Sequence, residues 1–156
     1  MAYCRCYPAA LMPGNELCIV MIFYYRGMIV INKICQVIDG EYVCDIDISV
    51  EEWKALLMNE KVFDSKSIEA LKKWYIEPNH SCTCFDIGKK YEQHSMSANG
   101  VINGLGGRVQ KELGRFEVKG IGNIAPGTKF ITVMKSKETG EKPKRYLWTI
   151  RDELVQ

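Results

Sequence analysis

The spacing of apolar residues changes twice along the chain, and these changes limit the fold more than any other feature of the sequence. Residues 29–48 are rich in β-branched residues, and from Tyr42 to Ile48 an apolar side chain occupies every second position, as in a strand with one buried face. From residue 49 to residue 113 apolar residues recur every three or four positions, as in helices that bury one side. Short β-type runs return after residue 115. We therefore predict an α+β fold.

An N-terminal β segment is expected to cover residues 28–48. Strands are predicted at residues 29–31, 34–38 and 42–48. The dipeptide Asp39-Gly40 lies between the last two, and it favours a tight hairpin turn because both turn positions need a positive φ.

Two amphipathic helices are predicted next. Ser49 and Glu52 have the spacing of a capping box, so the first helix is expected to begin at Ser49. The second is expected to begin near Asp64 or Ser65 and to end before Pro78.

Two further helices and three strands complete the prediction. A short helix is expected to be capped by Ser81 or Thr83, and a longer one is expected over residues 98–113, with Gly114 as the residue that ends it. The predicted strands then cover residues 116–118, 129–134 and 146–150, and a charged tip over residues 135–144 joins the last two.

Residues 1–27 do not have the pattern of the start of a folded domain. The apolar run Leu17–Tyr25 has nine residues, whereas a membrane span needs roughly 20. It also lacks the basic start of a signal peptide, which makes a cleaved signal or an anchor the less favoured alternative. We expect residues 1–27 to be poorly ordered, or to precede a true start at Met28.

The cysteines indicate a reducing compartment. The chain has seven cysteines, an odd number at irregular spacing, which predicts reduced thiols in the cytoplasm and not a disulfide framework. His80, Cys82 and Cys84, completed by Cys35 or Cys44, are an alternative zinc-binding set. We disfavour it because structural zinc ligands are usually spaced as CxxC or wider, and we expect no metal and no cofactor.

The charge of the chain is unevenly distributed. The chain has 156 residues and a net charge of +2, which suits one domain and does not by itself indicate a polyanionic partner. Residues 1–80 carry eight basic and eleven acidic residues, a net charge of −3, whereas residues 81–156 carry thirteen and eight, a net charge of +5. A face that binds nucleic acid is therefore expected in the second half.

The order of the predicted elements is typical of a winged helix-turn-helix. We expect a winged-helix-like helical core with a small antiparallel sheet over residues 49–156, in which residues 98–113 form the recognition helix and residues 135–145 form a wing. Asn99 and Asn103 are predicted to read base edges, because an asparagine amide can bind adenine through two hydrogen bonds. The full predicted DNA-binding set is His94, Ser97, Asn99, Asn103, Arg108, Lys111, Arg115, Lys135, Lys137, Lys144 and Arg145, and Lys142 lies on the same wing.

Four glycines lie inside the predicted recognition helix, at positions 100, 104, 106 and 107. Each lowers helix stability by about 0.5–1 kcal/mol relative to alanine. Close approach to another backbone or to phosphate would account for them, and a helix that starts later or frays is the alternative. The sequence around them is not a P-loop, since neither the Lys-Ser/Thr pair nor a preceding strand is present.

No catalytic set is predicted. Cysteine catalysis needs a partner base, and nothing in the sequence connects His80 or His94 with a thiol. We therefore expect a protein that is not itself an enzyme.

Residues 50–156 resemble a known family. The residues that carry the resemblance are Glu52–Leu57, Val62, Phe63, Leu71, Tyr75, Pro78–His80, His94, Asn99, Leu105, Gly106, Arg108, Tyr146, Trp148, Ile150, Arg151, Glu153 and Leu154. They are similar to the N-terminal head domain of McrA-type HNH restriction endonucleases, the modification-dependent (type IV) class. The resemblance implies a bacterial defence module that helps such a nuclease to engage DNA, through the helix that carries Asn99 and Arg108.

The chain departs from that family in two ways. Gly107 stands where the family often has a basic residue, which weakens the expected phosphate contact. The family's chains continue into a nuclease domain with histidine and asparagine ligands, whereas this sequence has two histidines, neither in such a context. No nuclease activity is carried over, and the chain is expected to be either a fragment of a broken gene or a head module whose nuclease partner is made separately.

Two functions from different classes remain open. The first is a double-stranded-DNA-binding module of a restriction-type system, with DNA that is possibly modified. The second is a winged helix that binds protein, either as a homodimer or docked on a nuclease subunit, which predicts an exposed apolar patch.

Overall fold

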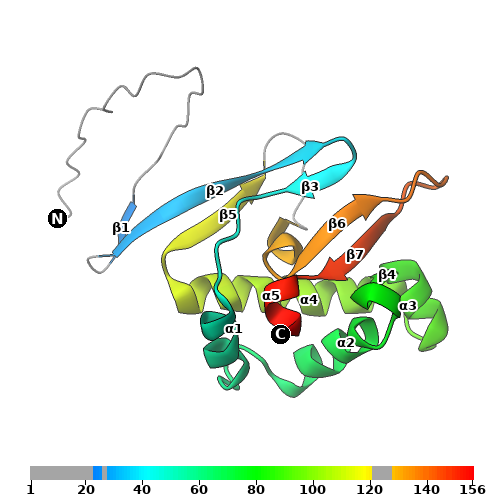
Figure 1. Cartoon of the computed structure of the whole chain (residues 1–156), viewed down its shortest axis with the longest axis horizontal. Coiled ribbons are helices and arrows are strands. Elements are labelled where there is room, and N and C mark those ends of the chain that lie inside the picture. The colour runs from blue at the N-terminus through cyan, green and yellow to red at the C-terminus, as the bar shows by residue number, and fades with distance from the viewer. Residues whose placement is uncertain (1–22, 26–27, 121–127) are drawn as a thin grey trace.

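The computed structural model describes residues 23–25, 28–120 and 128–156, and it has the predicted α+β architecture (Figure 1). Two small sheets and a group of helices surround one apolar core. The predictions for residues 1–27 fall outside the described residues, apart from the strand β1 (Phe23–Tyr25). None of the described helices is long and apolar enough to cross a bilayer.

The first sheet is built around β2 (Met28–Ile38). This strand pairs antiparallel with β1 and with β3 (Glu41–Val43), and parallel with β5 (Phe116–Gly120). At the β2–β3 connection Asp39 and Gly40 have φ of 48° and 81°, which confirms the predicted turn. The parallel β2–β5 pairing joins distant parts of the sequence and was not predicted.

The predicted strand over residues 42–48 is wrong beyond Val43. The Ile46 N–H donates to the Cys44 carbonyl at 3.0 Å, a three-residue turn that interrupts strand pairing. Cys44 and Ile46 still pack against the core, and Ile48 is buried. The alternating apolar residues of this segment therefore indicate that one side of it is buried, although the segment is irregular and not a strand.

The first two helices are confirmed. α1 (Val50–Leu57) begins after Ser49, whose Oγ accepts from the Glu52 N–H at 3.2 Å while the Glu52 carboxylate accepts from the Ser49 N–H at 2.9 Å, the reciprocal capping box. α2 (Ser65–Tyr75) begins after Asp64, whose Oδ1 accepts from the Ser67 N–H at 2.8 Å.

A short 3-10 helix, η1 (Pro78–His80), and the short strand β4 (Ser81–Thr83) precede α3 (Cys84–Lys90). Of the two predicted caps for α3, Thr83 is the one used: its Oγ1 accepts from the Asp86 N–H at 3.0 Å. The long helix α4 runs over Ser95–Leu113 and is followed by Gly114 with φ of 66°, as predicted for its end.

The second sheet has the strand order β4-β7-β6, with all pairs antiparallel. β6 covers Met134–Glu138, β7 covers Tyr146–Ile150, and the short helix α5 (Asp152–Val155) follows. The strand predicted over residues 129–134 is wrong for most of its length, because a 3-10 helix, η2 (Thr128–Thr132), packs there against α4.

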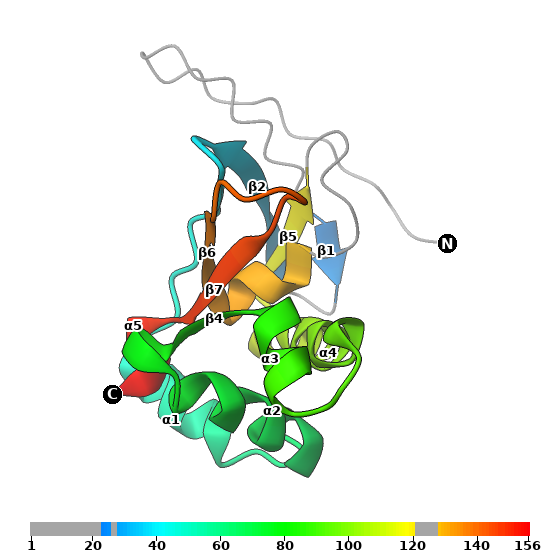
Figure 2. The same cartoon turned by 90° about the vertical axis from the view of Figure 1, so that its right-hand side faces the viewer.

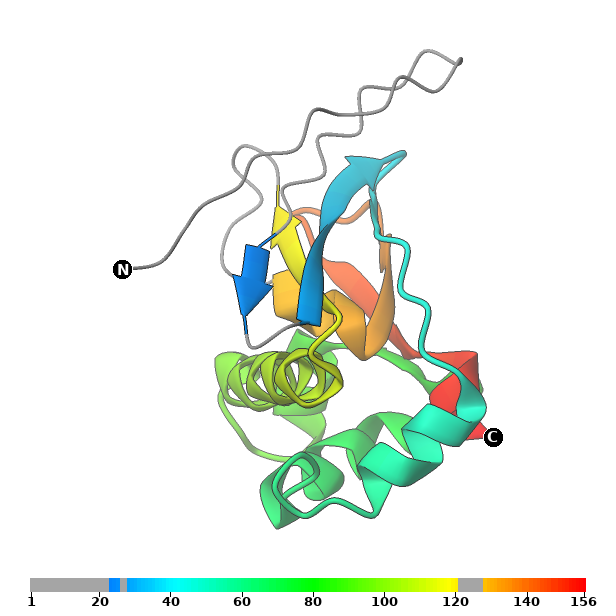
Figure 3. The ribbon, with the colours of Figure 1, turned by 90° about the vertical axis from the view of Figure 1, so that its left-hand side faces the viewer.

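The core lies between the helices and the two sheets. Its largest fully buried side chains include Trp53, Trp74, Phe63, Phe116 and Phe130. Figure 2 shows both sheets standing above the helices, and Figure 3 looks along α4, with the strands β1, β2 and β5 above it and α1 and α2 below. α4 is thus covered on several sides, and only part of its surface is open.

Candidate nucleic-acid interface

α4 has one open side. Its buried residues, among them Ile102, Leu105 and Val109, face α2, α3 and η2. The exposed residues on the opposite side follow one another at intervals of three, four and seven positions, which places them on one face of a helix. They are Ser97, Gly100, Gly104 and Lys111, and we call them the open strip of α4.

The structural reason for glycine differs from one position of α4 to another. A Cβ on Gly106 would lie 1.9 Å from the Lys129 carbonyl oxygen of η2, so only glycine permits the observed contact between α4 and η2. A Cβ on Gly100 would meet nothing within 4 Å. Close backbone approach therefore accounts for Gly106, whereas nothing in the described fold requires Gly100.

Lys129 was not among the predicted site residues. It was expected in a strand, but in η2 its side chain crosses α4 beside Gly107, with its Nζ 3.7 Å from where a Cβ of Gly107 would be. Lys111 lies one helical turn further along. Neither lysine has a carboxylate partner in the described part of the chain. The adjacent Gly106 and Gly107 indicated in the sequence that another segment would pack closely on α4. They did not indicate which segment it would be.

Arg108 was predicted to contact DNA, and in the structure its side chain makes contacts within the fold. Its Nε donates to the Val62 carbonyl at 2.8 Å, and its Nη2 donates to Ser67 Oγ at 2.6 Å and lies 3.4 Å from Asp64. Arg108 therefore holds α4 to the segment that joins α1 and α2.

Arg115 is likewise used inside the fold. It donates to both carboxylate oxygens of Glu52 and to the Asp47 carbonyl. These hydrogen bonds from Arg115 are the main reason why the pKa of Glu52 is lowered to about 2, and the same pairing raises the pKa of Arg115. The predicted phosphate contacts of Arg115 would require this pair to break.

The two asparagines that were predicted to read base edges are only partly exposed to solvent. Asn99 and Asn103 are both half-buried, and the Oδ1 atom of Asn103 is buried. Bidentate recognition of adenine needs both ends of the amide, and the buried Oδ1 atom of Asn103 is not presented in the way that this contact requires. α4 also begins three residues earlier than predicted, so Asn99 lies in its second turn and not at an open helix N-terminus.

The start of α4 contributes exposed polar groups. His94 and Ser97 are exposed, and the Ser97 N–H donates to the His94 carbonyl at 2.9 Å. Both lie at the end of the open strip that is opposite to Lys111.

The β6–β7 hairpin contains the residues that were predicted to form a wing, and most of its cations are in ion pairs. Lys135 pairs with Asp152 at 2.5 Å, and Lys144 pairs with Glu138 at 2.8 Å. Arg145 pairs with Glu141 at 3.5 Å and lies over the Phe85 ring at 4.0 Å.

Two other lysines of this hairpin differ from these cations in having no ion-pair partner among the described residues. Lys137 and Lys142 are exposed, and no described carboxylate pairs with either of them. Together with Lys89, Lys111 and Lys129 they are exposed cations of the second half of the chain that no described carboxylate pairs with.

The four cysteines that the structure describes, Cys35, Cys44, Cys82 and Cys84, are free thiols and are buried or half-buried. Burial raises the pKa of Cys44 to about 11 and that of Cys84 to about 12, which keeps both protonated at neutral pH. His80 stacks on Tyr75, and its Nδ1 donates to the Tyr75 carbonyl at 2.5 Å. Among the residues that the structure describes, no three histidine, cysteine or carboxylate side chains are grouped as metal ligands.

Comparisons with known proteins identify no relative. No known family, curated protein sequence or solved structure matches the chain. The candidate site therefore rests on the geometry of the described residues.

Proposed function

We propose that the chain is a non-catalytic winged-helix module that binds duplex DNA through phosphate contacts made by the open strip of α4 and the β6–β7 hairpin. The single observation that carries the proposal is the open strip itself: small or absent side chains at Ser97, Gly100 and Gly104, with Lys111 and the crossing Lys129 beside them. Such a surface allows a sugar-phosphate backbone to approach a helix closely and pairs it with two cations.

The order of elements supports the winged-helix part of the proposal. α2, α3 and α4 provide three helices, β4 lies between the first two, and the β6–β7 hairpin follows the third. The strand order β4-β7-β6 brings the short strand beside the last one. In a winged helix-turn-helix, α4 corresponds to the recognition helix and the tip of the hairpin to the wing.

The proposed contacts are to phosphate and not to bases. Arg108 and Arg115, which were predicted to contact DNA, make hydrogen bonds within the fold, and Asn103 has its Oδ1 atom buried. Lysine ammonium groups act on phosphate as point charges. The proposed binding is therefore weak, salt-dependent and largely indifferent to sequence.

The biological setting is proposed from the resemblance of residues 50–156 to the head domain of McrA-type restriction endonucleases. In that setting the module is bacterial and cytoplasmic, and it brings a separately made nuclease to DNA. The nuclease supplies the catalytic residues, and this chain supplies affinity for the duplex.

Paired substitutions test the site. At low salt, Lys111→Ala combined with Lys129→Ala is expected to weaken binding of a fluorescein-labelled 24-base-pair duplex at least fivefold in fluorescence anisotropy. The matched control is Lys54→Ala combined with Lys61→Ala, which removes the same charge from exposed positions on and after α1. Equal losses in the two double variants would refute the site, because they would show an effect of net charge alone.

A further inference from the structure

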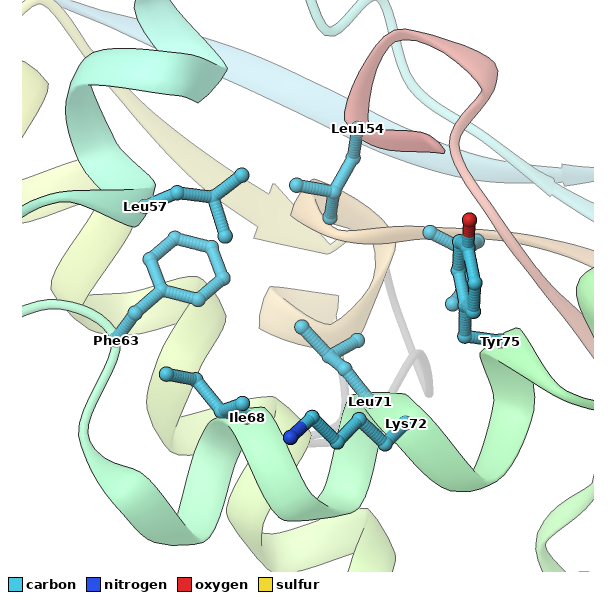
Figure 4. Close-up of a pocket in the computed structure, with 8 residues that line it drawn as sticks. Leu57, Phe63, Ile68, Leu71, Lys72, Tyr75 and Leu154 are labelled. Carbon is cyan, nitrogen blue, oxygen red and sulfur yellow. The ribbon is translucent and has the colours of Figure 1, made fainter. Parts of the chain in front are cut away.

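A second open surface is apolar and lies away from α4. The apolar groove is formed by α1, α2, the end of β7 and α5, and its lining includes Leu57, Phe63, Ile68, Leu71 and Leu154. Figure 4 shows these side chains converging on one opening. Its volume of about 150 Å³ is that of a cavity which holds one benzene-sized apolar group.

Some apolar residues that line the groove, or directly follow a lining residue in the chain, are exposed. Leu57 and Tyr75 line it and are 40% and 51% exposed, and the neighbouring Met58 and Ile76 are 86% and 65% exposed. Exposed apolar surface at a groove commonly marks a binding site. The proposed DNA contacts do not use the groove, and its lining combines buried core residues, Phe63 and Leu71 among them, with exposed ones.

One cation gives the groove a preferred type of partner. Lys72 is the single charged residue that lines it. In Figure 4 the Lys72 side chain lies along the α2 edge with its ammonium group toward Ile68. No carboxylate in the described residues forms an ion pair with Lys72, so a carboxylate of a partner would find it available.

We propose that the apolar groove binds an amphipathic helix of another protein, which inserts one large apolar side chain and sets a carboxylate against Lys72. The groove walls are helical: Ile68, Leu71, Lys72 and Tyr75 follow one another at helical spacing on α2. A helix-in-groove mode suits such walls, because helices satisfy their own backbone groups and offer no strand edge to an extended peptide.

Charge argues against a second copy of this chain as the occupant. Packing of α2 against α2 around a two-fold axis through the groove would bring the two Lys72 side chains toward each other, since an isologous interface pairs each patch with itself. Two ammonium groups without a carboxylate between them repel. A partner with acidic residues beside its apolar anchor meets no such cost.

Three synthetic peptides provide the test. The first is a fluorescein-labelled 16-residue helix with three leucines on one face, glutamates beside them, and alanine and glutamine elsewhere. The second replaces each glutamate with lysine, and the third replaces each leucine with serine. The full-length chain is expected to bind the glutamate peptide at least tenfold more tightly than the lysine peptide, and to bind the serine peptide at least tenfold more weakly than the glutamate peptide.

Two variants locate that binding. Ile68→Asp is expected to weaken binding of the glutamate peptide at least tenfold, whereas Ile38→Asp, at a 49% exposed position on β2, is expected to leave it unchanged. Lys72→Glu is expected to reverse the preference in favour of the lysine peptide. Lys72 is exposed and not part of the core. The reversed peptide preference of Lys72→Glu therefore tests the groove even if a circular-dichroism melt shows that Ile68→Asp does not fold.

Four results would overturn the proposal. They are no binding of any peptide, equal binding of the glutamate and lysine peptides, a concentration-dependent dimer that Ile68→Asp abolishes, and partition onto phosphatidylserine-containing vesicles that Ile68→Asp abolishes. The proposal is separate from DNA binding, because Lys111→Ala with Lys129→Ala is expected to leave peptide affinity unchanged.

Discussion

At the residue scale, side chains that look alike in the sequence have different roles in the fold. Arg108 donates to Val62 and Ser67 within the molecule, whereas Lys111, three positions on, is exposed. A Cβ on Gly106 would collide with the backbone of η2, whereas a Cβ on Gly100 would meet nothing within 4 Å. Charge and size alone could not separate these pairs, because their roles depend on which segment crosses α4.

Gly106 should therefore be far less tolerant than Gly100. Gly106→Ala forces α4 away from the Lys129 carbonyl and is expected to lower the free energy of unfolding by about 1–3 kcal/mol, as for overpacking of a core. Gly100→Ala is expected to raise it by about 0.4–1 kcal/mol, because the helix gains a better former in open space. Urea denaturation measures both. Equal effects of the two substitutions would contradict the close contact between α4 and η2.

The Glu52–Arg115 pair predicts a pH dependence of stability. The folded pKa of Glu52 is lowered from 4.5 to about 2, so the stabilisation is fully present above pH 4.5 and is lost as the pH falls toward 2. Because the Glu52 side chain is 34% exposed, solvent screening limits the contribution to about 1 kcal/mol.

Glu52→Gln separates the charge from the cap, since glutamine also completes a capping box. Thermal melts between pH 6 and pH 2 are expected to show a smaller loss of stability in Glu52→Gln than in the parent chain. A parallel loss in both proteins would mean that the ion pair contributes nothing in this pH range.

At the element scale, local signals predicted local structure well. The capping residues Ser49, Asp64 and Thr83, the Asp39-Gly40 turn and Gly114 each act within a few positions of the chain. Each was predicted, Asp64 and Thr83 as one of two candidates. The failures concern distant partners. The β2–β5 pairing, the early end of β3 and the 3-10 helix η2 depend on segments that meet only in the folded chain, and no local pattern encodes them.

For the candidate site, too, the sequence predicted local features better than contacts between distant segments. The sequence predicted the helix on which the candidate site is proposed. It also predicted a tip over residues 135–145, of which residues 139–145 lie between the strands and residues 135–138 belong to β6. It did not predict that Arg108 and Arg115 would be held by Ser67 and Glu52, or that Lys129 would lie beside the open strip. These outcomes depend on packing between elements and not on periodicity.

Arg108 is expected to connect elements and not to bind DNA. Arg108→Ala leaves the Val62 carbonyl and the fully buried Ser67 hydroxyl without this donor, which is expected to lower the free energy of unfolding by about 2 kcal/mol. DNA affinity, measured below the unfolding temperature, is expected to change less than twofold. A large loss of affinity with unchanged stability would restore Arg108 to the DNA-binding site.

At the scale of the whole molecule, two open surfaces are distinct in chemistry. The open strip of α4 is small and carries Lys111 and Lys129, whereas the apolar groove carries one cation among large apolar side chains. The two surfaces share no residue. A module that binds DNA with one and an acidic helix with the other would bring its partner to the duplex.

The salt dependence of DNA binding tests this account most directly. With two to four lysines on phosphate, a plot of the logarithm of the association constant against the logarithm of the salt concentration is expected to have a slope of about −2 to −4. Unrelated 24-base-pair duplexes, methylated or not, are expected to give the same affinity within about threefold, because the proposed contacts are to phosphate and not to base edges. Absence of binding at low salt, or a slope near zero, would contradict the proposed function.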